Sequence, residues 1–315
     1  MENKAKRLLI IDSNSIIHRA YHALPPLATK KGEIVNAVYG FLLVFLKAVK
    51  DFQPDFIVAA FDSPGPTFRH KKYEEYKAKR PKAPDELYQQ IPRVKEILTA
   101  FEVPFFAVQG FEADDIIGTI ASLAPRKQAV PSLEMIILSG DSDALQLVNS
   151  KTKVYLLKKG VKNIVLYDEN LTVEKFQGLS PEQILDFKAL RGDASDNIPG
   201  VTGIGEKTAI KLLLEFGSLQ RIYEEWPDEK TAKEKGFSPR LREALLKYKE
   251  QAFLSRGLAE IDKTVPIDFN LNKCSFGDYN KEAVSQILKK FNFFSLLGKL
   301  PGVSQEKIGE NLKLW

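Results

Sequence analysis

The chain has 315 residues, 44% of them hydrophobic, which is enough for a substantial core and about two domains. The single cysteine, Cys274, excludes an intramolecular disulfide, and three histidines are too few for a Cys/His zinc cage, so a metal site would need carboxylates. The 46 basic and 41 acidic residues give a net charge of +5, which alone is weak evidence for a polyanionic ligand.

The N-terminal residues MENKAKRLLIIDSN lead directly into a strand-like run and lack the anatomy of a signal peptide. No run approaches the roughly 20 apolar residues of a membrane span. We therefore expect a cytoplasmic protein with no membrane partner.

Short apolar runs alternate with helical patterns along the first half of the chain. The runs of strand length are 8–11, 56–61, 103–108 and 135–138, and residues 37–52, 87–101 and 113–124 have helical spacing between them. This alternation predicts an α/β domain with a mostly parallel sheet flanked by helices.

Acidic residues follow each of these four strands: Asp12, then Asp62, then Glu112, Asp114 and Asp115, and finally Asp141 and Asp143. Ligands of open α/β sheets bind at the carboxyl ends of the strands, so these side chains are expected to meet in one crevice. The alternative for a single acid is an ordinary helix N-cap, but that does not account for four strands together.

So many carboxylates in one cleft would repel each other unless cations neutralised them. Hard divalent cations prefer oxygen ligands, and Mg²⁺ takes only one or two carboxylates directly. The sequence therefore predicts two Mg²⁺ ions, for which Mn²⁺ can substitute, placed to act on a phosphodiester.

Residues 66–82, PTFRHKKYEEYKAKRPK, hold seven Lys or Arg against two Glu. This segment starts shortly after Asp62, and its tyrosines place stacking surfaces between the cations. We expect it to bind single-stranded nucleic acid beside the metal site, although most charge runs are solvated helix faces. The predicted contacts are Arg69, Lys71, Lys72, Tyr73 and Tyr76.

Residues 191–209, RGDASDNIPGVTGIGEKTA, place acids beside a glycine-rich turn between two helices, which are predicted at 181–191 and from 206 through 216. A helix-hairpin-helix of this kind holds a DNA backbone through main-chain N–H groups, whereas the alternative is an ordinary αα-corner. The predicted DNA contacts are Gly200, Gly203, Gly205, Lys207, Thr208 and Lys211.

Five ordered blocks resemble the bacterial 5′ nuclease domain of DNA polymerase I, which belongs to the flap endonuclease family. The blocks are IIDSN, AAFDSPGPTFRHKKYEEYKAKR, GFEADD, SGDSDALQL and RGDASDNIPGVTGIGEKTA, and the resemblance spans about residues 6–300. It implies a structure-specific 5′ nuclease that cuts flaps and 5′ ends with two Mg²⁺ ions.

The resemblance also implies roles for particular residues. Asp12, Asp62, Glu112 and Asp114 correspond to a first metal cluster, and Asp141, Asp143, Asp193 and Asp196 to a second, with Asp115 sharing the site. Lys77 and Arg80 correspond to basic arch residues that face the scissile phosphate. The family's hairpin, here 200–207, commonly holds a K⁺ ion through backbone carbonyls.

These interpretations give an α/β nuclease core at 1–178 with a basic helical arch at about 66–95, a helix-hairpin-helix region at 179–300 and a tail at 301–315. The expected partners are DNA with a 5′ flap or 5′ end and a DNA polymerase, in the same chain or a separate one, and we expect a monomer.

Two other functions are open. A haloacid-dehalogenase-like phosphatase also starts from an Asp after the first strand, but Asn14 stands where its second Asp is needed. A non-catalytic DNA-binding clamp would use the hairpin and leave the acids unexplained. His18 and His22, four residues apart, are expected on a polar helix face and not in a catalytic site.

Overall fold

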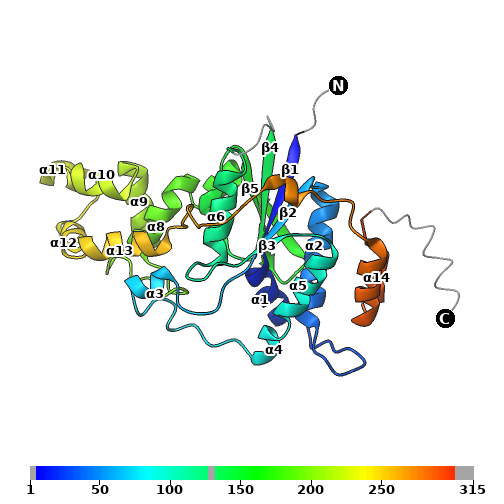
Figure 1. Cartoon of the computed structure of the whole chain (residues 1–315). Coiled ribbons are helices and arrows are strands. Elements are labelled where there is room, and N and C mark those ends of the chain that lie inside the picture. The colour runs from blue at the N-terminus through cyan, green and yellow to red at the C-terminus, as the bar shows by residue number, and fades with distance from the viewer. Residues whose placement is uncertain (1–4, 127–131, 302–315) are drawn as a thin grey trace.

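The computed structural model describes residues 5–126 and 132–301. At its centre is a six-stranded sheet in the order β3-β2-β1-β4-β5-β6 (Figure 1), parallel except for the β5–β6 pair. The strands are β1 (Lys6–Asp12), β2 (Phe56–Ala60), β3 (Phe105–Phe106), β4 (Leu133–Ser139), β5 (Thr152–Lys159) and β6 (Asn163–Tyr167). The predicted mostly parallel sheet is confirmed.

Helices cover both faces of the sheet. One face packs against α1 (Ser13–Ala23), α2 (Asn36–Phe52) and α5 (Ile91–Ala100), and the other against α6 (Ala113–Leu123). Leu9 and Ile11 of β1 belong to the first core, Leu8 and Ile10 to the second. Since side chains alternate along a strand, burial of both faces requires the continuous apolar run seen in the sequence.

The sequence analysis missed two strands and overestimated one. Only Phe105 and Phe106 of the predicted run 103–108 pair with β2. β5 carries four apolar residues between lysines, and β6 is a partly exposed edge strand, so neither has a long apolar run. Their antiparallel pairing buries them enough to complete the sheet.

A separate helical unit follows the sheet and has its own apolar core. It contains the two predicted helices, found at α8 (Ile184–Arg191, preceded by the 3₁₀ turn η2, Pro181–Gln183) and at α9 (Glu206–Phe216). The other helices after the sheet are α7 (Glu169–Lys175), α10 (Leu219–Glu224), α11 (Glu229–Glu234), α12 (Pro239–Lys247) and α13 (Lys249–Ala259).

The last part of the predicted region 179–300 packs apart from the helical unit. From about residue 260 the chain returns to the α/β core, through η3 (Leu271–Cys274), α14 (Lys281–Lys290) and α15 (Phe294–Leu297). Ile261 packs in the core that contains α6, and Phe291 packs in the core that contains α2 and α5. Residues 302–315 of the predicted tail lie outside the described residues.

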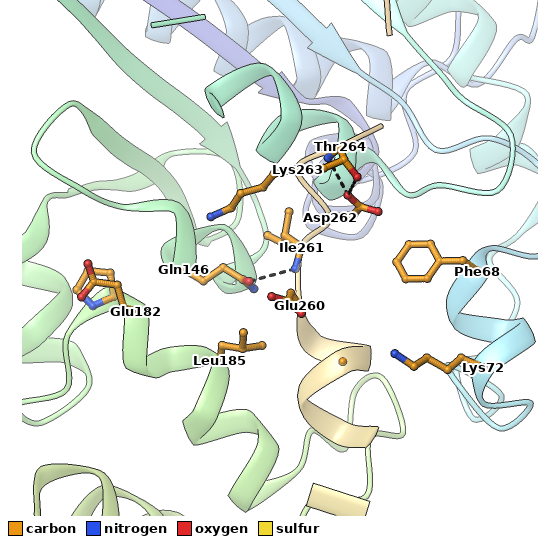
Figure 2. Close-up of a pocket in the computed structure, with 12 residues that line it drawn as sticks. Phe68, Lys72, Gln146, Glu182, Leu185, Glu260, Ile261, Asp262, Lys263 and Thr264 are labelled. Carbon is orange, nitrogen blue, oxygen red and sulfur yellow. Dashed lines mark hydrogen bonds between the residues drawn. The ribbon is translucent and has the colours of Figure 1, made fainter. Parts of the chain in front are cut away.

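Three parts of the molecule meet where the chain leaves α13. Gln146 fixes the chain at this crossing from α13 to the α/β core. Its side chain accepts a hydrogen bond from the Ile261 N–H and donates one to the Ala259 carbonyl, both at 3.2 Å. Figure 2 shows the crossing beside a cavity of about 510 Å³ that is also lined by Phe68 and Lys72 of the basic segment.

The predicted helical arch at 66–95 contains little helix. Only α3 (Phe68–Lys72), α4 (Asp85–Tyr88) and the start of α5 are helical, and turns and extended chain occupy 73–84. Lys77 lies in the left-handed region at φ 56°, and its N–H donates to the Asp196 carbonyl at 2.9 Å. This contact with the helical unit, together with Pro81 and Pro84, replaces a continuous helix.

None of the helices in the described part of the chain combines the length and apolar character needed to cross a bilayer.

Candidate active site

The carboxyl ends of the parallel strands bring the predicted acids to one edge of the sheet. Asp12 ends β1, Asp62 follows β2, and Asp141 follows β4 and begins η1 (Ser142–Leu147). Glu112 and Asp114 lie at the start of α6, and Asp62 reaches this helix by accepting a hydrogen bond from the Ala113 N–H at 2.8 Å. The first two strands, β4 and α6 therefore share one acidic cleft.

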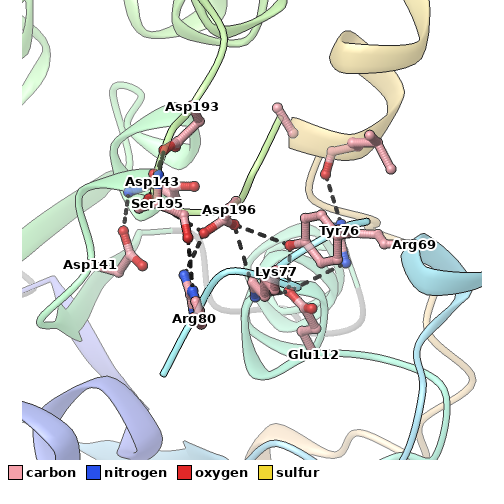
Figure 3. A network of polar contacts seen from close by, with 12 residues as sticks. Arg69, Tyr76, Lys77, Arg80, Glu112, Asp141, Asp143, Asp193, Ser195 and Asp196 are labelled. Carbon is pink, nitrogen blue, oxygen red and sulfur yellow. Dashed lines mark hydrogen bonds and ion pairs between the residues drawn. The ribbon is translucent and has the colours of Figure 1, made fainter. Parts of the chain in front are cut away.

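The helical unit contributes the remaining acids through a short turn. The N–H and carbonyl of Asp193 pair with those of Ile198 at 2.9 and 2.8 Å, which closes a tight loop after α8. Asp193 and Asp196 both lie in this loop and face Asp143 and the arch segment (Figure 3). The cleft is thus formed between the sheet edge and the helical unit.

Burial changes the acidity of the innermost carboxyl groups. Asp12 is 3% exposed, and this burial raises its pKa to about 6, although hydrogen bonds from Ser139 (2.6 Å) and Ser15 oppose the change. Burial also raises the pKa of Asp114 well above its usual range, with further increases from the charges of Asp12, Asp141 and Asp143. These groups resist ionisation mainly because they are buried, and the neighbouring carboxylates add to this.

Lys188 of α8 lies within the acidic cleft and was missed by the sequence analysis. Its ammonium contacts Asp143 and also Asp193 at 2.7 Å. Burial would lower the Lys188 pKa, but the two carboxylates raise it, so the side chain stays charged. The pKa of Asp143 is raised by burial to about 7 despite Lys188, whereas the pKa of Asp193 falls to about 2, because Lys188 and Ser195 outweigh its burial.

The arch segment supplies two more cations to the cleft. Lys77 contacts Glu112 at 2.8 Å, and Arg80 is hydrogen-bonded to Asp196 (Figure 3). Burial disfavours the charge on Lys77, but Glu112 and Asp196 raise its pKa overall. Lys77 and Arg80 therefore lie between the sheet edge and the helical unit, paired with acids of the cleft.

Asp115 was predicted to share the metal site, but it points away from the cleft. It is 0% exposed, and both of its oxygens accept hydrogen bonds from Arg69 at 2.7 Å. Its Oδ1 also accepts from the Asp262 N–H and its Oδ2 from the Glu112 N–H. These contacts occupy both oxygens, so the prediction of a metal ligand is not supported at this position.

Two predicted DNA contacts of the arch segment are buried and cannot reach DNA. Arg69 is 3% exposed, and besides Asp115 it donates to the carbonyls of Leu258 (2.9 Å) and Glu260 (2.6 Å) at the end of α13. Tyr76 is also 3% exposed, and its hydroxyl bonds to Glu112 and Asp196. Both side chains therefore join the arch to the core and the helical unit.

The other arch positions are accessible to different degrees. Lys71 and Lys72 are exposed, and Tyr73 is half-buried. Lys72 extends toward Gly257 of α13 beside the cavity in Figure 2.

The glycines of the hairpin between α8 and α9 differ in burial. Gly200 is buried, its N–H donates to Ser255 and its carbonyl accepts from Gln251, and an added Cβ would lie 2.2 Å from the Gly192 nitrogen. Gly200 therefore serves packing, which corrects its prediction as a DNA contact. Gly203 and Gly205 are exposed, and a Cβ there would meet no atom within 4 Å.

Cationic side chains extend from this open end of the hairpin. Lys207 and Lys211 of α9 are exposed and Thr208 is half-buried. Lys211 also donates to the Gly236 carbonyl at 3.3 Å and lies over the Phe237 ring. Within the described residues, no hydrogen bond uses the N–H groups of Gly203 or Gly205, so they are available to an anion.

The chemistry of these donors suits a hard divalent cation, since the cleft offers many carboxylate oxygens. Among residues 5–126 and 132–301, however, no three such side chains are arranged to hold one ion together. Lys77, Arg80 and Lys188 stand between the acids and neutralise part of their charge. A metal ion would therefore displace at least one of these ammonium or guanidinium groups.

Some residues that shape the cleft had no clear signal in the sequence. Lys188 looks like any cation in the last turn of a helix, and Ser139 and Ser195 look like ordinary loop residues. Ser139 bonds to Asp12, and Ser195 bonds to Asp193 at 2.6 Å. Only their tertiary neighbours reveal these contacts.

Comparisons with known proteins cover almost the whole chain. A family model described as "5'-3' exonuclease, N-terminal resolvase-like domain" matches residues 7–177, and one described as "5'-3' exonuclease, C-terminal SAM fold" matches residues 179–282. The first match contains the acids of the sheet edge, and the second contains the hairpin.

Among curated relatives, DNA polymerase I of Bacillus subtilis (strain 168) is 41% identical over 301 residues, which are 96% of this chain and 33% of the relative. DNA polymerase I of Bacillus caldotenax is 39% identical over 302 residues, with the same coverages of 96% and 33%. The chain thus spans about one third of the length of these relatives.

Solved structures share the fold at lower identity. The T5 D15 protein co-crystallised with metal ions gives a TM-score of 0.66 at 20% identity, covering 90% of this chain and 99% of that one. The catalytic core of Rad2 in complex with DNA substrate gives 0.55 at 21% identity, with coverages of 98% and 92%. These likenesses show a shared fold, and the two family models show that the chain belongs to the 5′-3′ exonuclease family.

Proposed function

We propose that the chain is a structure-specific 5′ nuclease, acting as a 5′-3′ exonuclease and flap endonuclease that hydrolyses DNA with two divalent cations, Mg²⁺ or Mn²⁺. The observation that carries this proposal is the excess of carboxylate in one cleft. Asp12, Asp114 and Asp143 all have raised pKa values because burial and neighbouring acids disfavour their charged forms. Divalent cations would relieve this repulsion.

The proposed ligands form two groups on the two sides of the cleft. Asp12, Asp62, Glu112 and Asp114 would hold one ion from β1, β2 and α6, and Asp141, Asp143, Asp193 and Asp196 would hold the other. When bound, such ions supply positive charge that stabilises the charge developing on a reacting phosphodiester. Asp115 is left out because Arg69 occupies its oxygens.

Lys77 and Arg80 would bind the phosphate beside these ions. Each is paired with a single carboxylate at hydrogen-bonding distance, Lys77 with Glu112 and Arg80 with Asp196. A metal ion that takes over those carboxylates would release an ammonium and a guanidinium group at the mouth of the cleft. Both groups form strong charge-assisted hydrogen bonds to phosphate oxygens.

The hairpin would hold the duplex part of the substrate. Its free N–H groups at Gly203 and Gly205, with the exposed Lys207 and Lys211, suit the sugar-phosphate backbone and carry no base information. The relatives are DNA polymerases. We therefore propose primer or flap removal in replication and repair, next to a polymerase in the same polypeptide or in a separate chain.

The test is cleavage of an end-labelled duplex with a 5′ flap. We expect cutting in Mg²⁺ or Mn²⁺, no cutting in excess EDTA, and a loss of orders of magnitude for Asp141→Asn in Mg²⁺. The exposed Asp85, outside the cleft, provides the control Asp85→Asn, which should cut normally. Robust cutting in EDTA would refute the metal-dependent nuclease, and binding without cutting in any divalent metal would favour the clamp.

A further inference from the structure

A second recess lies on the α/β core next to the acidic cleft. It occupies about 550 Å³ between α1 and the turn that joins β5 to β6, and its lining includes Ser15, His18, Arg19, His22, Lys159 and Gly160. We call it the α1–β5 groove. No carboxylate lines it, although acidic residues dominate the neighbouring cleft.

Three side chains of the groove have no hydrogen-bonding or ion-pair partner among the described residues. In the described part of the chain, the side chains of His18, His22 and Lys159 make no hydrogen bond or ion pair. By contrast, Lys77, Arg80 and Lys188 in the cleft are each paired with carboxylate. N–H donors and a lysine that form no ion pair with a protein carboxylate are suited to an external anion.

Arg19 fixes the wall of the groove and connects it with the cleft. Its guanidinium donates to the Gly140 carbonyl at 2.6 Å and to the Lys158 carbonyl at 3.0 Å, which ties α1 to the carboxyl ends of β4 and β5. Gly140 directly precedes Asp141, and the Gly140 N–H donates to Ser15 at the groove end. His18 lies close enough to the cleft to interact electrostatically with Asp62 and Arg80.

We propose that the α1–β5 groove binds the backbone phosphates of the single-stranded segment of the substrate. This inference rests on the proposed nuclease function and adds a second binding region to it. Lys159 supplies a positive charge, and the two imidazoles supply N–H donors and ring faces against which bases can stack. The recess lies on the α/β core, whereas the hairpin that suits a duplex lies on the separate helical unit (Figure 1).

The test compares binding of two labelled DNAs in metal-free buffer, a duplex with a long 5′ flap and the same duplex with a bare 5′ end. The variant combines His22→Gln with Lys159→Gln, two exposed side chains without protein partners. We expect about three- to tenfold weaker binding of the flap substrate, a salt dependence reduced by about one unit, and no change for the bare end.

The matched control is Lys151→Gln, an exposed lysine at the opposite end of β5, which should leave both affinities unchanged. Unchanged flap binding in the double variant, or an equal loss on both DNAs, would overturn the proposed groove. Binding is measured without cleavage, so the two proposals can fail separately. A wild-type protein that never cuts would refute the nuclease, and weaker flap binding by the double variant would still support the groove.

Discussion

The arch segment and the hairpin were both predicted to bind DNA through cations, yet the structure uses them differently. In the arch, Arg69, Lys77 and Arg80 turn inward and pair with carboxylates. In the hairpin, Gly203, Gly205 and Lys207 face solvent. These three arch cations are therefore held by carboxylates, while the hairpin presents N–H groups and a lysine that are open to a ligand.

The difference shows that a cation's role follows from what faces it. A basic segment next to many acids satisfies those acids first, because an unpaired buried charge is unfavourable. The hairpin faces no comparable acid cluster, so its amides stay free. Variants in the two regions should consequently fail in different ways, the arch in stability or cleavage and the hairpin in binding.

The largest effect is expected from the buried contact of the arch. Arg69→Ala leaves Asp115 charged and buried without its bidentate partner, and should lower the free energy of unfolding by about 3–5 kcal/mol. Urea denaturation measures this, with the exposed Lys71→Ala as control. A loss below about 1 kcal/mol would mean that the arch is not held to the core through this pair.

Lys77→Ala should reduce the single-turnover cleavage rate by about a hundredfold or more, on the scale of losing a transition-state hydrogen bond, while flap affinity changes little. Its neighbour Lys79 is exposed and makes no ion pair in the described residues, so Lys79→Ala is the matched control. If Lys77→Ala instead weakens binding as much as cleavage, the two regions do not differ in the way described above.

The acids of the cleft should respond to pH in opposite directions in metal-free buffer. The pKa of Asp114 is raised in the folded state, so its contribution favours folding below about pH 4 and is lost as pH rises. Asp114→Asn should therefore be more stable than wild type at pH 8, and the difference should shrink as the pH falls toward about 4.

Asp193 provides the opposite case. Its pKa is lowered to about 2, so its contribution is present above about pH 4 and is lost as pH falls toward 2. Asp193→Asn should be less stable than wild type at pH 8, by about 2 kcal/mol, and the difference should shrink in acid. Thermal unfolding across pH measures both variants, and shifts of the same sign at pH 8 would contradict the assigned ion pairs.

The smallest effect is expected in the hairpin. Gly203→Ala should weaken duplex binding by roughly three- to tenfold, because a methyl group there keeps a phosphate from the open amides. Gly32 has a similar positive φ, 82° against 90°, and equally open surroundings, so Gly32→Ala carries the same backbone strain as a control. Equal binding by the two variants would argue against hairpin contacts with DNA.

The sequence by itself determined three central strands of the sheet and the position of the acids that follow them. Continuous apolar runs identify β1, β2 and β4 because both faces are buried, and an acid after each run must then lie at the carboxyl edge. The Ser-Pro start of η2 and the glycine pattern likewise determined α8, α9 and the turn between them. These are local signals, which depend on residues close in the chain.

Only the tertiary structure decided which charges pair. Arg69 and Lys77 belong to the same basic run, yet one binds Asp115, 46 residues away, and the other Glu112, 35 residues away. Lys188 meets Asp143 only because α8 packs beside η1, and residues 260–300 leave the helical unit because their apolar side chains complete the α/β cores. Such pairings depend on which residues are neighbours in three dimensions, and the spacing of residues in the sequence does not predict them.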